Sequence, residues 1–514
     1  MSNMITGYLL GVDVGTTSIK VAIINEKAQL LGMSSSSYKL ITPDQDSVQI
    51  DTEDMWRAYL KCIRLLKDGK GIDLSKVVGI SISSLCPGLA ALDENGKVLV
   101  DPIIYSDRRS TEEAEIIKKA VGEDRLFEIT ANTAMAGAMS GTSMLWIKRN
   151  LPEAYEKTKY FGHVNTLMAQ RMSGEFAIDY SNASYTNLFE TTGGLKWSEE
   201  LCEKTGIDIQ KLPPLHSSTD VVGGLINEDL IKMGIPQGTP IVIGGGDTAC
   251  ATLAAGVTKA GDVCESVGTT NVLTICVDEP KFDRGFINRC HVVDGKWIYQ
   301  GALSHTGASY QWFRDNYYQE FLTGEIDPKY VFNLMNDDAA KAEAGSGGVV
   351  FLPYMLGERS PIWDPYARGV FFGISLHTGR KEMNRAIMEG CGYGLKQLAD
   401  IAEKVTGREI KSFVSIGGGA KSTVWAQIKA DITGKDIEIL DMNDMAPIGA
   451  ALLAGVGANV FKDVYEAADM VEKKVFKCIK SNHDNDAVYA KRYKVYTELY
   501  PKIKELYKVG SNLY

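Results

Sequence analysis

Apolar runs of strand length alternate with helical patterns along the whole chain, which predicts an α/β fold with parallel crossovers. The first half opens with two apolar strands joined by one tight turn, so that it begins as a meander. A helix with apolar residues at helical spacing is predicted over 56–66, and a helix of small residues over 248–255. The strands predicted in this half are 8–14, 19–24, 77–83 and 240–243.

The second half of the chain repeats this plan. Its predicted strands are 263–267, 272–277 and 413–416. The last of them leads through a glycine-rich turn into a helix predicted over 423–432. A chain of 514 residues is too long for one hydrophobic core. We therefore expect two related domains, formed by residues 1–257 and residues 258–514.

Two glycine-rich phrases each occur twice, in the same order. Gly-Thr-Thr occupies residues 15–17 and 268–270, and Gly-Gly-Gly occupies residues 244–246 and 417–419. A strand that ends in Gly-Thr-Thr and turns directly into another strand exposes consecutive N–H groups and two hydroxyls, which suit phosphate oxygens. Two such turns, facing each other across a cleft, would hold a triphosphate between them.

Four tyrosines near the C-terminus share one face of a predicted helix, which Pro501 is expected to interrupt. These tyrosines are Tyr489, Tyr493, Tyr496 and Tyr500. We expect the stripe to pack on its own domain. The alternative is a contact between subunits, which would make the protein a homodimer.

The composition indicates the class of protein and the cellular compartment. Apolar residues make up 45% and charged residues 23% of the chain, as in a soluble globular protein with a full core. The net charge of −10 argues against a nucleic-acid partner, which normally meets a basic face. The nine cysteines are scattered without a C-x-x-C pair, which indicates reduced thiols. Because neither a signal-peptide pattern nor an apolar stretch of about 18 residues is seen, we expect a cytoplasmic protein outside the membrane.

Asp13 stands two residues before Gly15, at the end of the first strand, where a carboxylate can reach a hydrated Mg²⁺ bound to phosphates. The simpler alternative is a turn residue that accepts hydrogen bonds from the following amides. The second copy of the turn has Ser266 at the matching position. Since a purely structural role would favour similar residues in both copies, the difference favours metal binding by Asp13.

Asp247 follows three glycines and begins a helix, so helix capping is its simplest role. The glycine turn of the second half has Ala420 at that point, so this kind of turn does not need a carboxylate. At a cleft between domains, Asp247 would act as a general base for a hydroxyl proton and share in metal binding. The positive end of its helix is expected to lower the pKa of this carboxylate and keep it ionised.

The glycines at 417–419, followed by Ala420 and Lys421, do not form a P-loop, because the G-x-x-x-x-G-K-[ST] spacing is absent. Small residues at this turn fit a flat adenine or ribose lying against the backbone. The alternative is plain packing between a strand and a helix, and the residues alone leave both open.

Taken in order, these segments resemble the signature motifs of the FGGY family of carbohydrate kinases, over essentially the whole chain. Residues 11–18 resemble the first phosphate turn of the family, and residues 244–247 its catalytic-base motif. The segment 369–374, followed after a spacer by 382–383 and 386–389, matches the C-terminal signature position by position. The resemblance implies an α/β fold of two actin-like, ribonuclease H-like ATPase domains, with ATP and a sugar meeting in the inter-domain cleft.

The resemblance also assigns roles to individual residues. Those that would face the phosphates of ATP are Thr16, Thr17, Ser18, Lys20, Gly268, Thr269, Gly307 and Gln311. Those that would lie near the nucleoside are Gly418, Gly419 and Thr423. Asp13 and Asp247 would bind Mg²⁺, and Asp247 would also be the catalytic base.

The resemblance implies that the first domain would bind most of the acceptor sugar, through Cys86, Pro87, Asp107 and Asp247. Cys86 and Pro87 stand where glycerol kinase has an Arg-Glu pair and xylulokinase a Met-His pair, so neither substrate assignment transfers. Asp107 lies in a stretch that resembles the Trp-x-Asp-x-Arg segment of the family. An anionic acceptor would require a cation near these residues, and Arg108 and Arg109 are available.

The predicted function is therefore ATP-dependent phosphorylation of a hydroxyl on a small sugar, with a ketopentose such as xylulose as the first choice. One alternative is a different acceptor, such as gluconate, a polyol or a deoxysugar. The other is a non-catalytic, actin-like protein that binds nucleotide or sugar. The presence of both Asp13 and Asp247 favours the enzyme, with ATP, Mg²⁺ and a small sugar as its ligands.

Overall fold

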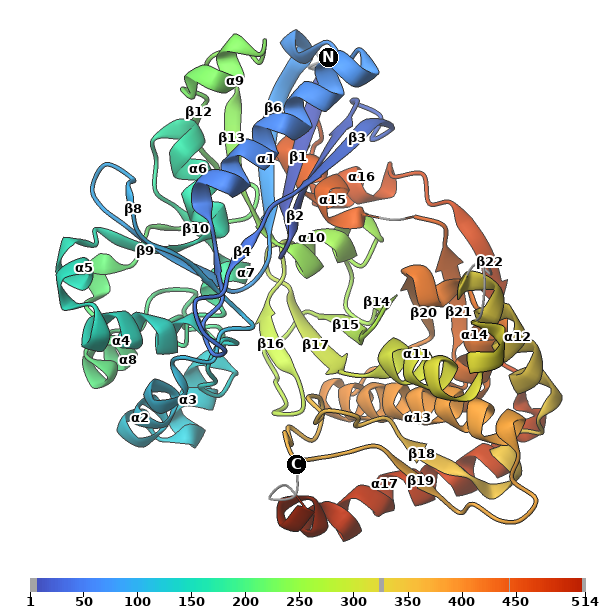
Figure 1. The fold of residues 1–514 in the computed structure, drawn as a ribbon. Coiled ribbons are helices and arrows are strands. Elements are labelled where there is room, and N and C mark those ends of the chain that lie inside the picture. The colour runs from blue at the N-terminus through green and yellow to red at the C-terminus, as the bar shows by residue number, and fades with distance from the viewer. Residues whose placement is uncertain (1–6, 323–327, 443, 511–514) are drawn as a thin grey trace.

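The computed structural model describes residues 7–322, 328–442 and 444–510, and it contains two large twisted sheets (Figure 1). The strands of the first sheet are β1 (Tyr8–Val14), β2 (Ser18–Ile24), β3 (Leu30–Ser37), β6 (Val77–Ser84), β12 (Val221–Gly224) and β13 (Pro240–Gly246). Their order in the sheet is β12-β13-β6-β1-β2-β3. β1, β2 and β3 form an antiparallel meander, whereas β6 runs parallel to β1 and β13 parallel to β6.

The second sheet repeats this order. Its strands are β14 (Val263–Val267), β15 (Asn271–Val277), β16 (Ile287–Cys290), β17 (Trp297–Leu303), β20 (Ser412–Ile416), β21 (Asp436–Leu440) and β22 (Val475–Ile479). β14, β15 and β17 form the antiparallel meander, and β20 and β21 add in parallel on the β14 side. The strand order β17-β15-β14-β20-β21 therefore matches β3-β2-β1-β6-β13, and the two halves of the chain repeat one plan.

The matched strand orders correct one inference from the sequence. The glycines at 244–246 end β13, whereas the glycines at 417–419 follow β20, whose counterpart in the first half is β6. The two turns are not equivalent, and the comparison of Asp247 with Ala420 was wrong. The counterpart of the 417–419 turn is the segment after β6 that contains Cys86. Glycine content alone misled the comparison because it does not report which strand a turn follows.

A smaller sheet and several helices extend the first half to one side. The order in this smaller sheet is β4 (Leu40–Ile41), β5 (Gln49–Ile50), β8 (Val98–Ile104), β7 (Gly88–Leu92) and β9 (Tyr160–His163). The short strands β10 (Ile178–Asp179) and β11 (Leu215–His216) pair beside it. The helices are α1 (Thr52–Arg64), α2 (Thr111–Val121), α3 (Glu123–Thr130), α4 (Ser140–Asn150), α5 (Pro152–Lys157), α6 (Val164–Ser173), α7 (Tyr180–Ala183), α8 (Glu199–Thr205), α9 (Glu228–Lys232) and α10 (Asp247–Ala254).

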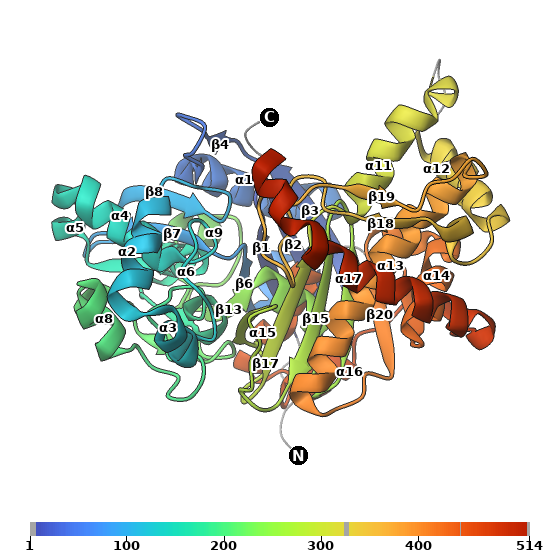
Figure 2. The ribbon, with the colours of Figure 1, turned by 90° about the horizontal axis from the view of Figure 1, so that it is seen from below.

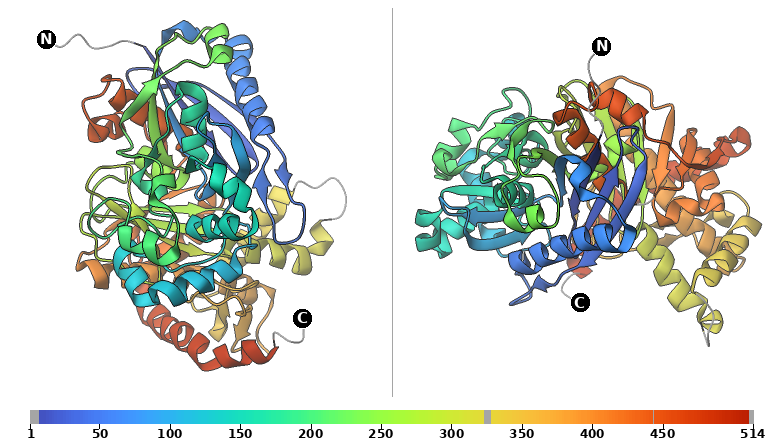
Figure 3. Two further views of the ribbon diagram at one scale, coloured as in Figure 1. Left: turned by 90° about the vertical axis from the view of Figure 1, so that its left-hand side faces the viewer. Right: turned by 90° about the horizontal axis from the view of Figure 1, so that it is seen from above.

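The helices of the second half lie on the side of the molecule away from the smaller sheet, apart from the first two after β21, which lie beside the first sheet (Figures 1, 2 and 3). They are α11 (Thr306–Tyr317), α12 (Pro328–Lys341), α13 (Arg380–Thr406), α14 (Thr423–Thr433), α15 (Met445–Gly457), α16 (Val464–Asp469) and α17 (Asp486–Gly510). A two-stranded ribbon of β18 (Val350–Leu352) and β19 (Val370–Phe372) lies between α13 and α17 in Figure 1.

The tyrosine stripe of α17 packs on its own half of the molecule, as the sequence predicted. Its fully buried members are Tyr489 and Tyr496. The helix runs through Pro501 to Gly510, so the expectation that this proline interrupts it was wrong. Contacts on both sides of the proline hold the helix: Tyr500 Oη donates to Asp364 Oδ2 at 2.8 Å, and Tyr507 Oη donates to the carbonyl oxygen of Arg368 at 3.0 Å.

Helices α10 and α15 lie between the two sheets and join them (Figure 1). They follow the equivalent strands β13 and β21, one in each half. They cross at Gly449, where an added Cβ would lie only 1.9 Å from the carbonyl oxygen of Cys250. α15 also lies directly on β1, because a Cβ at Gly11 would meet the carbonyl oxygen of Pro447 at 1.9 Å. A helix of the second half therefore packs on the sheet of the first.

One hydrophobic core is shared between the halves. It includes Leu9 of β1, Cys264 of β14 and Ile416 of β20 together with the small residues of α10 and α15. Alternate residues of β1, such as Leu10 and Val12, enter a second core beneath α1. Because β1 is buried on both faces, its sequence is a continuous apolar run rather than an alternating one.

None of the helices in the described part of the chain combines the length and the apolar character that crossing a membrane requires. All nine cysteines are free thiols, in agreement with the prediction from their spacing.

Candidate active site

The topology of the first sheet brings the two candidate acids to one edge. Asp13 lies near the end of β1, and Asp247 directly follows β13. β6 lies between these two strands, and its Ser83 is the register partner of both Asp13 and Gly245. Ser83 Oγ donates a hydrogen bond to Asp13 Oδ1 at 2.8 Å. The carboxyl ends of parallel strands are where open α/β sheets bind ligands.

A cavity of about 380 Å³ opens at this edge, between the two halves of the molecule. Asp13, Lys20 and Asp247 line it from the first half, and Ser266 and Gly417 line it from the second. The ends of β1, β13, β14 and β20 thus surround one space. The predicted cleft between the halves is present, and Asp247 faces it.

Asp247 does not cap its helix. It is the first residue of α10, the N-cap is Gly246, and the cap makes no side-chain hydrogen bond. Asp247 Oδ1 accepts hydrogen bonds from the next residue, from Thr248 N at 2.6 Å and from Thr248 Oγ1 at 3.2 Å. Its Oδ2 makes no hydrogen bond to any residue that the structure describes. One oxygen therefore fixes the side chain, and the other is left for a ligand in the cavity.

Burial dominates the electrostatics of both acids. Burial, helped by the negative charge of Asp247, raises the pKa of Asp13 to about 7. Burial also raises the pKa of Asp247, while Arg289 and the hydrogen bonds from Thr248 act against this shift. The sequence expectation of a lowered pKa at Asp247 was wrong, because loss of hydration outweighs the helix terminus.

The pair of acids fits a magnesium ion. Asp13 is buried and Asp247 is partly buried, and the charge of Asp247 raises the pKa of Asp13, so a divalent cation that neutralises both is favoured. Among residues 7–322, 328–442 and 444–510, no group of three or more His, Cys, Asp or Glu side chains is placed to hold a metal on its own. Mg²⁺ is commonly held by one or two carboxylates and the phosphates of a substrate, so Asp13 and Asp247 suffice.

The first Gly-Thr-Thr turn is braced from several sides. Gly15 N donates to the carbonyl oxygen of Ser18 at 3.0 Å, and Tyr38 Oη donates to the carbonyl oxygen of Gly15. The hydroxyls of Thr16 and Tyr105 lie 3.1 Å apart. Thr17, at the tip of the turn, is exposed. The turn is held rigidly while its tip stays accessible, as a phosphate-binding turn requires.

The second Gly-Thr-Thr turn meets the start of α11. Gly268 N donates to the carbonyl oxygen of Thr270 at 2.8 Å, and Ala308 N donates to that of Thr269 at 3.0 Å. At Gly307 an added Cβ would lie 2.1 Å from the carbonyl oxygen of Gly268. The structure therefore brings the predicted residues 268, 269 and 307 together, and it leaves Gln311 exposed one turn further along α11.

The predicted nucleoside turn lies next to the second phosphate turn. An added Cβ at Gly417 would lie 2.6 Å from the carbonyl oxygen of Val267, and one at Gly419 would lie 2.6 Å from Val267 Cγ1. Val267 immediately precedes Gly268. Ser422 then caps α14 through Trp425 N, so Thr423 is the first residue of that helix. Gly418 is exposed at the tip of the turn.

Lys20, a predicted phosphate ligand, lies on β2 and pairs across the halves. Its Nζ lies 2.6 Å from Oδ1 of Asp444, the residue before α15. Both side chains are about one-third exposed. Lys20 lines the cavity, so it can exchange this partner for a phosphate oxygen.

Of the predicted acceptor residues, Cys86 and Pro87 lie near Asp247, whereas Asp107 lies in a separate network. An added Cβ at Gly246, beside Asp247, would lie 2.9 Å from Cys86 Sγ. Cys86 Sγ itself donates to Asn182 Oδ1 at 2.8 Å. The segment of Cys86 and Pro87 therefore borders Asp247.

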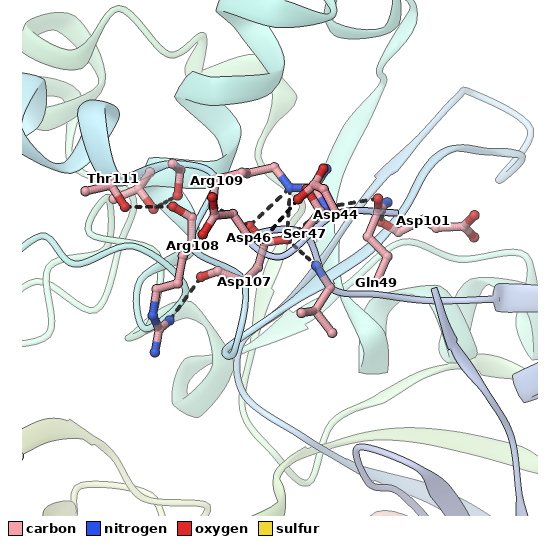
Figure 4. A network of polar contacts seen from close by, with 12 residues as sticks. Asp44, Asp46, Ser47, Gln49, Asp101, Asp107, Arg108, Arg109 and Thr111 are labelled. Atoms are coloured by element: carbon pink, nitrogen blue, oxygen red, sulfur yellow. Dashed lines mark hydrogen bonds and ion pairs between the residues drawn. The ribbon is translucent and has the colours of Figure 1, made fainter. Parts of the chain in front are cut away.

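Asp107 is buried in a network of its own (Figure 4). Its Oδ2 accepts from Val48 N at 2.7 Å and from Arg109 Nε at 2.8 Å, and its Oδ1 accepts from Arg109 N at 3.0 Å. Arg108 donates to backbone carbonyl oxygens, including those of Tyr105 and Asp107. Both oxygens of Asp107 and the guanidinium of Arg109 are thus bonded within this loop. Arg108 is exposed and bonds through Nη1 alone, so a contact between this segment and an acceptor stays a prediction.

Two arginines in this part of the molecule were missed by the sequence reasoning. Arg289 of β16 is buried, and its charge acts on Asp247, Cys86 and Tyr185. The charge of Arg359 also acts to lower the pKa of Tyr185, and Arg359 Nε donates to Ser304 Oγ at 3.1 Å. The sequence held no clear signal for Arg289, because its strand mixes polar and apolar residues.

Comparison with known proteins agrees with this geometry. The model of the N-terminal domain of the FGGY family of carbohydrate kinases matches residues 8–254, and the model of the C-terminal domain matches residues 264–458. The chain belongs to the FGGY family of carbohydrate kinases. It is therefore a phosphotransferase that acts on an alcohol group.

Relatives of the kinase match it over nearly their whole length. It is 29% identical to the xylulose kinase of Bacillus subtilis (strain 168) over 503 residues, which are 97% of this chain and 98% of that protein. It is also 29% identical to the gluconokinase of the same organism over 476 residues, which are 91% of this chain and 90% of that one. Identity at this level does not separate the two acceptors.

Solved structures share the fold of the kinase. The ligand-bound xylulose kinase from Lactobacillus acidophilus has a TM-score of 0.88 at 25% identity and covers 98% of this chain and 99% of its own. The xylulose kinase from Rhodospirillum rubrum has a TM-score of 0.89 at 24% identity, with 98% and 100% covered. The predicted α/β fold of two actin-like ATPase domains is confirmed.

Proposed function

We propose that the kinase transfers the γ-phosphoryl group of ATP to a hydroxyl of a ketopentose of the xylulose type, with Mg²⁺ as cofactor. The observation that carries the proposal is the position of Asp247. This carboxylate starts α10 with one oxygen unbonded and faces a cavity that the ends of both sheets surround. Full-length xylulose kinase relatives support the choice of acceptor.

The two Gly-Thr-Thr turns position the nucleotide in this proposal. The N–H groups and hydroxyls of residues 15–18 and 268–270, together with Gly307, Gln311 and Lys20, bind phosphate oxygens. The turn of Gly418 and Gly419, with Thr423, holds the nucleoside beside them. Binding from both halves fixes the phosphoryl group relative to the acceptor, and positioning is the main contribution of a protein to phosphoryl transfer.

Asp247 accepts the proton of the attacking hydroxyl through its free oxygen, while Thr248 holds the other oxygen in place. Asp13 and Asp247 would hold the magnesium ion, with Ser83 orienting Asp13. When bound, this cation neutralises charge on the transferred phosphoryl group. Residues 1–257 supply the base and the acceptor contacts in this assignment, and residues 258–514 supply the nucleoside contacts.

Replacing Asp247 by Asn tests the proposal. Loss of a general base lowers kcat by about 10²–10⁴-fold, because Asn cannot take the hydroxyl proton. Binding of ATP without Mg²⁺, followed by calorimetry in EDTA, should change by less than about threefold, because Asn keeps the hydrogen bonds from Thr248. The matched control is Asp469→Asn on the exposed surface of α16, which should change neither quantity.

The assay follows ADP release over a panel of ketopentoses, ketohexoses, polyols and aldonates. Stimulation by D-xylulose above the other acceptors is the expected result. Near-normal turnover by the Asn variant would refute the role of Asp247. A protein that hydrolyses ATP slowly and responds to no acceptor would instead be a nucleotide switch.

A further inference from the structure

Arg289 carries a buried positive charge with no hydrogen-bonding partner. The residue is 1% exposed, and none of its Nε, Nη1 and Nη2 atoms has a hydrogen-bond acceptor among the residues that the structure describes. Its guanidinium lies over the ring of Tyr185, 5.2 Å from the ring centre. An unpaired buried charge costs several kcal/mol, so a fold keeps one only where something else compensates for it.

The guanidinium lies beside the base. An added Cβ at Gly246 would lie 2.8 Å from Arg289 Nη1 and 2.9 Å from Cys86 Sγ. Gly246 immediately precedes Asp247. Arg289 and Cys86 therefore flank the same point of the backbone, at the end of β13, where the attacking hydroxyl must lie.

The other buried acid nearby is not available to pair with Arg289. Asp179 Oδ1 accepts from Asn165 Nδ2 at 2.8 Å and from Asn182 Nδ2 at 2.6 Å. Its Oδ2 accepts from Ser181 N at 2.7 Å and from the Ser181 hydroxyl. Both oxygens of Asp179 thus point at other donors, and the donors of Arg289 are left without an anion.

The strand that carries Arg289 is anchored on the first half, so its position is not accidental. Asn288 N donates to Asn132 Oδ1 at 3.0 Å, and Asn132 Nδ2 donates back to the carbonyl oxygen of Asn288 at 2.7 Å. On the other side, Cys290 N donates to Ser184 Oγ at 3.1 Å. These bonds hold β16 of the second half against the loops of the first and fix Arg289 near Asp247.

We propose that Arg289 determines acceptor specificity by donating to a carbonyl or carboxylate oxygen of the sugar substrate, at the part of the molecule that Asp247 does not deprotonate. A planar guanidinium presents parallel N–H donors that match the oxygen of a trigonal carbon. A polyol has no such oxygen and leaves the charge poorly paired. The inference rests on the proposed function and adds the class of acceptor to it.

Three five-carbon acceptors that share their hydroxyl groups at C3, C4 and C5 test the inference. D-Xylulose carries a ketone, D-xylonate a carboxylate, and xylitol neither. Arg289→Met should lower kcat/KM at least tenfold for the preferred one of the first two, and less than threefold for xylitol, with KM for ATP unchanged. A preference for xylulose identifies the carbonyl, and a preference for xylonate identifies the carboxylate.

Two further variants keep the result interpretable. Arg289→Lys retains the charge without the planar guanidinium, so its kcat/KM should lie between those of the wild type and Arg289→Met. If the Met variant does not fold, the Lys variant still gives the comparison with the wild type. The control is Arg284→Met, an exposed arginine shortly before β16 that pairs with Asp124, and it should change no acceptor constant.

An equal loss for all three acceptors, or no loss for any, would overturn the role of Arg289. Failure of the proposed function looks different, because the wild type would then phosphorylate none of them. Calorimetry still decides in that case. Xylulose or xylonate should bind the wild type at least tenfold more tightly than the Arg289→Met variant, and absence of binding to both would reject the inference.

Discussion

Replacing Asp13 by Asn should stabilise the metal-free kinase above pH 7 while abolishing phosphoryl transfer. Burial and the charge of Asp247 raise the pKa of Asp13 from 3.8 to about 7. The ionised carboxylate is therefore an unfavourable group in the folded state. Asparagine removes the charge and keeps an oxygen to accept the hydrogen bond from Ser83.

The sign of the effect follows from proton binding. Between about pH 4 and pH 7, Asp13 loses its proton in the unfolded chain but keeps it in the folded one, so stability falls as pH rises through this range. Above pH 7 the loss is complete. One pKa unit is worth about 1.4 kcal/mol, so the ionised group costs the fold up to about 4 kcal/mol.

Urea unfolding in the presence of EDTA measures this difference. At pH 8.5 we expect the Asp13→Asn variant to exceed the wild type by about 2–4 kcal/mol, and at pH 4.5 by less than about 1 kcal/mol. Asp469→Asn, an exposed carboxylate, serves as the control and should show no such pH dependence. An Asn variant that is less stable than the wild type at pH 8.5 would refute the reasoning.

The remaining predictions concern packing and charge. Gly449→Ala should lower the free energy of unfolding in urea by about 2 kcal/mol or more, because its Cβ would lie 1.9 Å from a carbonyl oxygen of α10. Gly69→Ala, where an added Cβ has no atom within 4 Å, should leave it unchanged, and equal losses for the two variants would contradict this. Lys429→Met should cost about 3–5 kcal/mol by leaving Glu265 buried without its partner at 2.6 Å, whereas adding Glu265→Leu should restore most of the stability. Lys20→Met should raise KM for ATP in steady-state kinetics but change unfolding by less than about 1 kcal/mol, since its ion pair is exposed; an unchanged KM would remove Lys20 from the phosphate site.

Much of the fold could be predicted from the sequence because its signals are local. The first strands of both halves are apolar runs followed by Gly-Thr-Thr, and each signal lies within about ten residues. The equivalence of the glycine turns failed because the order of strands in a sheet is set by contacts between distant segments. The predicted break at Pro501 failed for a similar reason. Hydrogen bonds from Tyr500 and Tyr507 to the 364–368 loop hold α17 on both sides of the proline.

The residues of the candidate site could be predicted where they lie in a sequence motif. They could not be predicted where only the tertiary structure brings them to the site. Asp13 and Asp247 each adjoin a glycine motif, but the sequence does not show that burial raises the pKa of both. Asp107 also lies in a motif, yet Arg109 and Val48 N occupy its oxygens.

Arg289 shows how the fold itself contributes to the site. It lies on β16 of the second half, a short strand of mixed polar and apolar residues in which an arginine has no local meaning. It gains one only because Asn132 and Ser184 of the first half hold β16 in place. Since Asp247 comes from the first half and Arg289 from the second, an acceptor that touches both must bridge the two halves. Acceptor binding would then favour the arrangement in which the phosphate turns face each other, and transfer to water would be disfavoured without an acceptor.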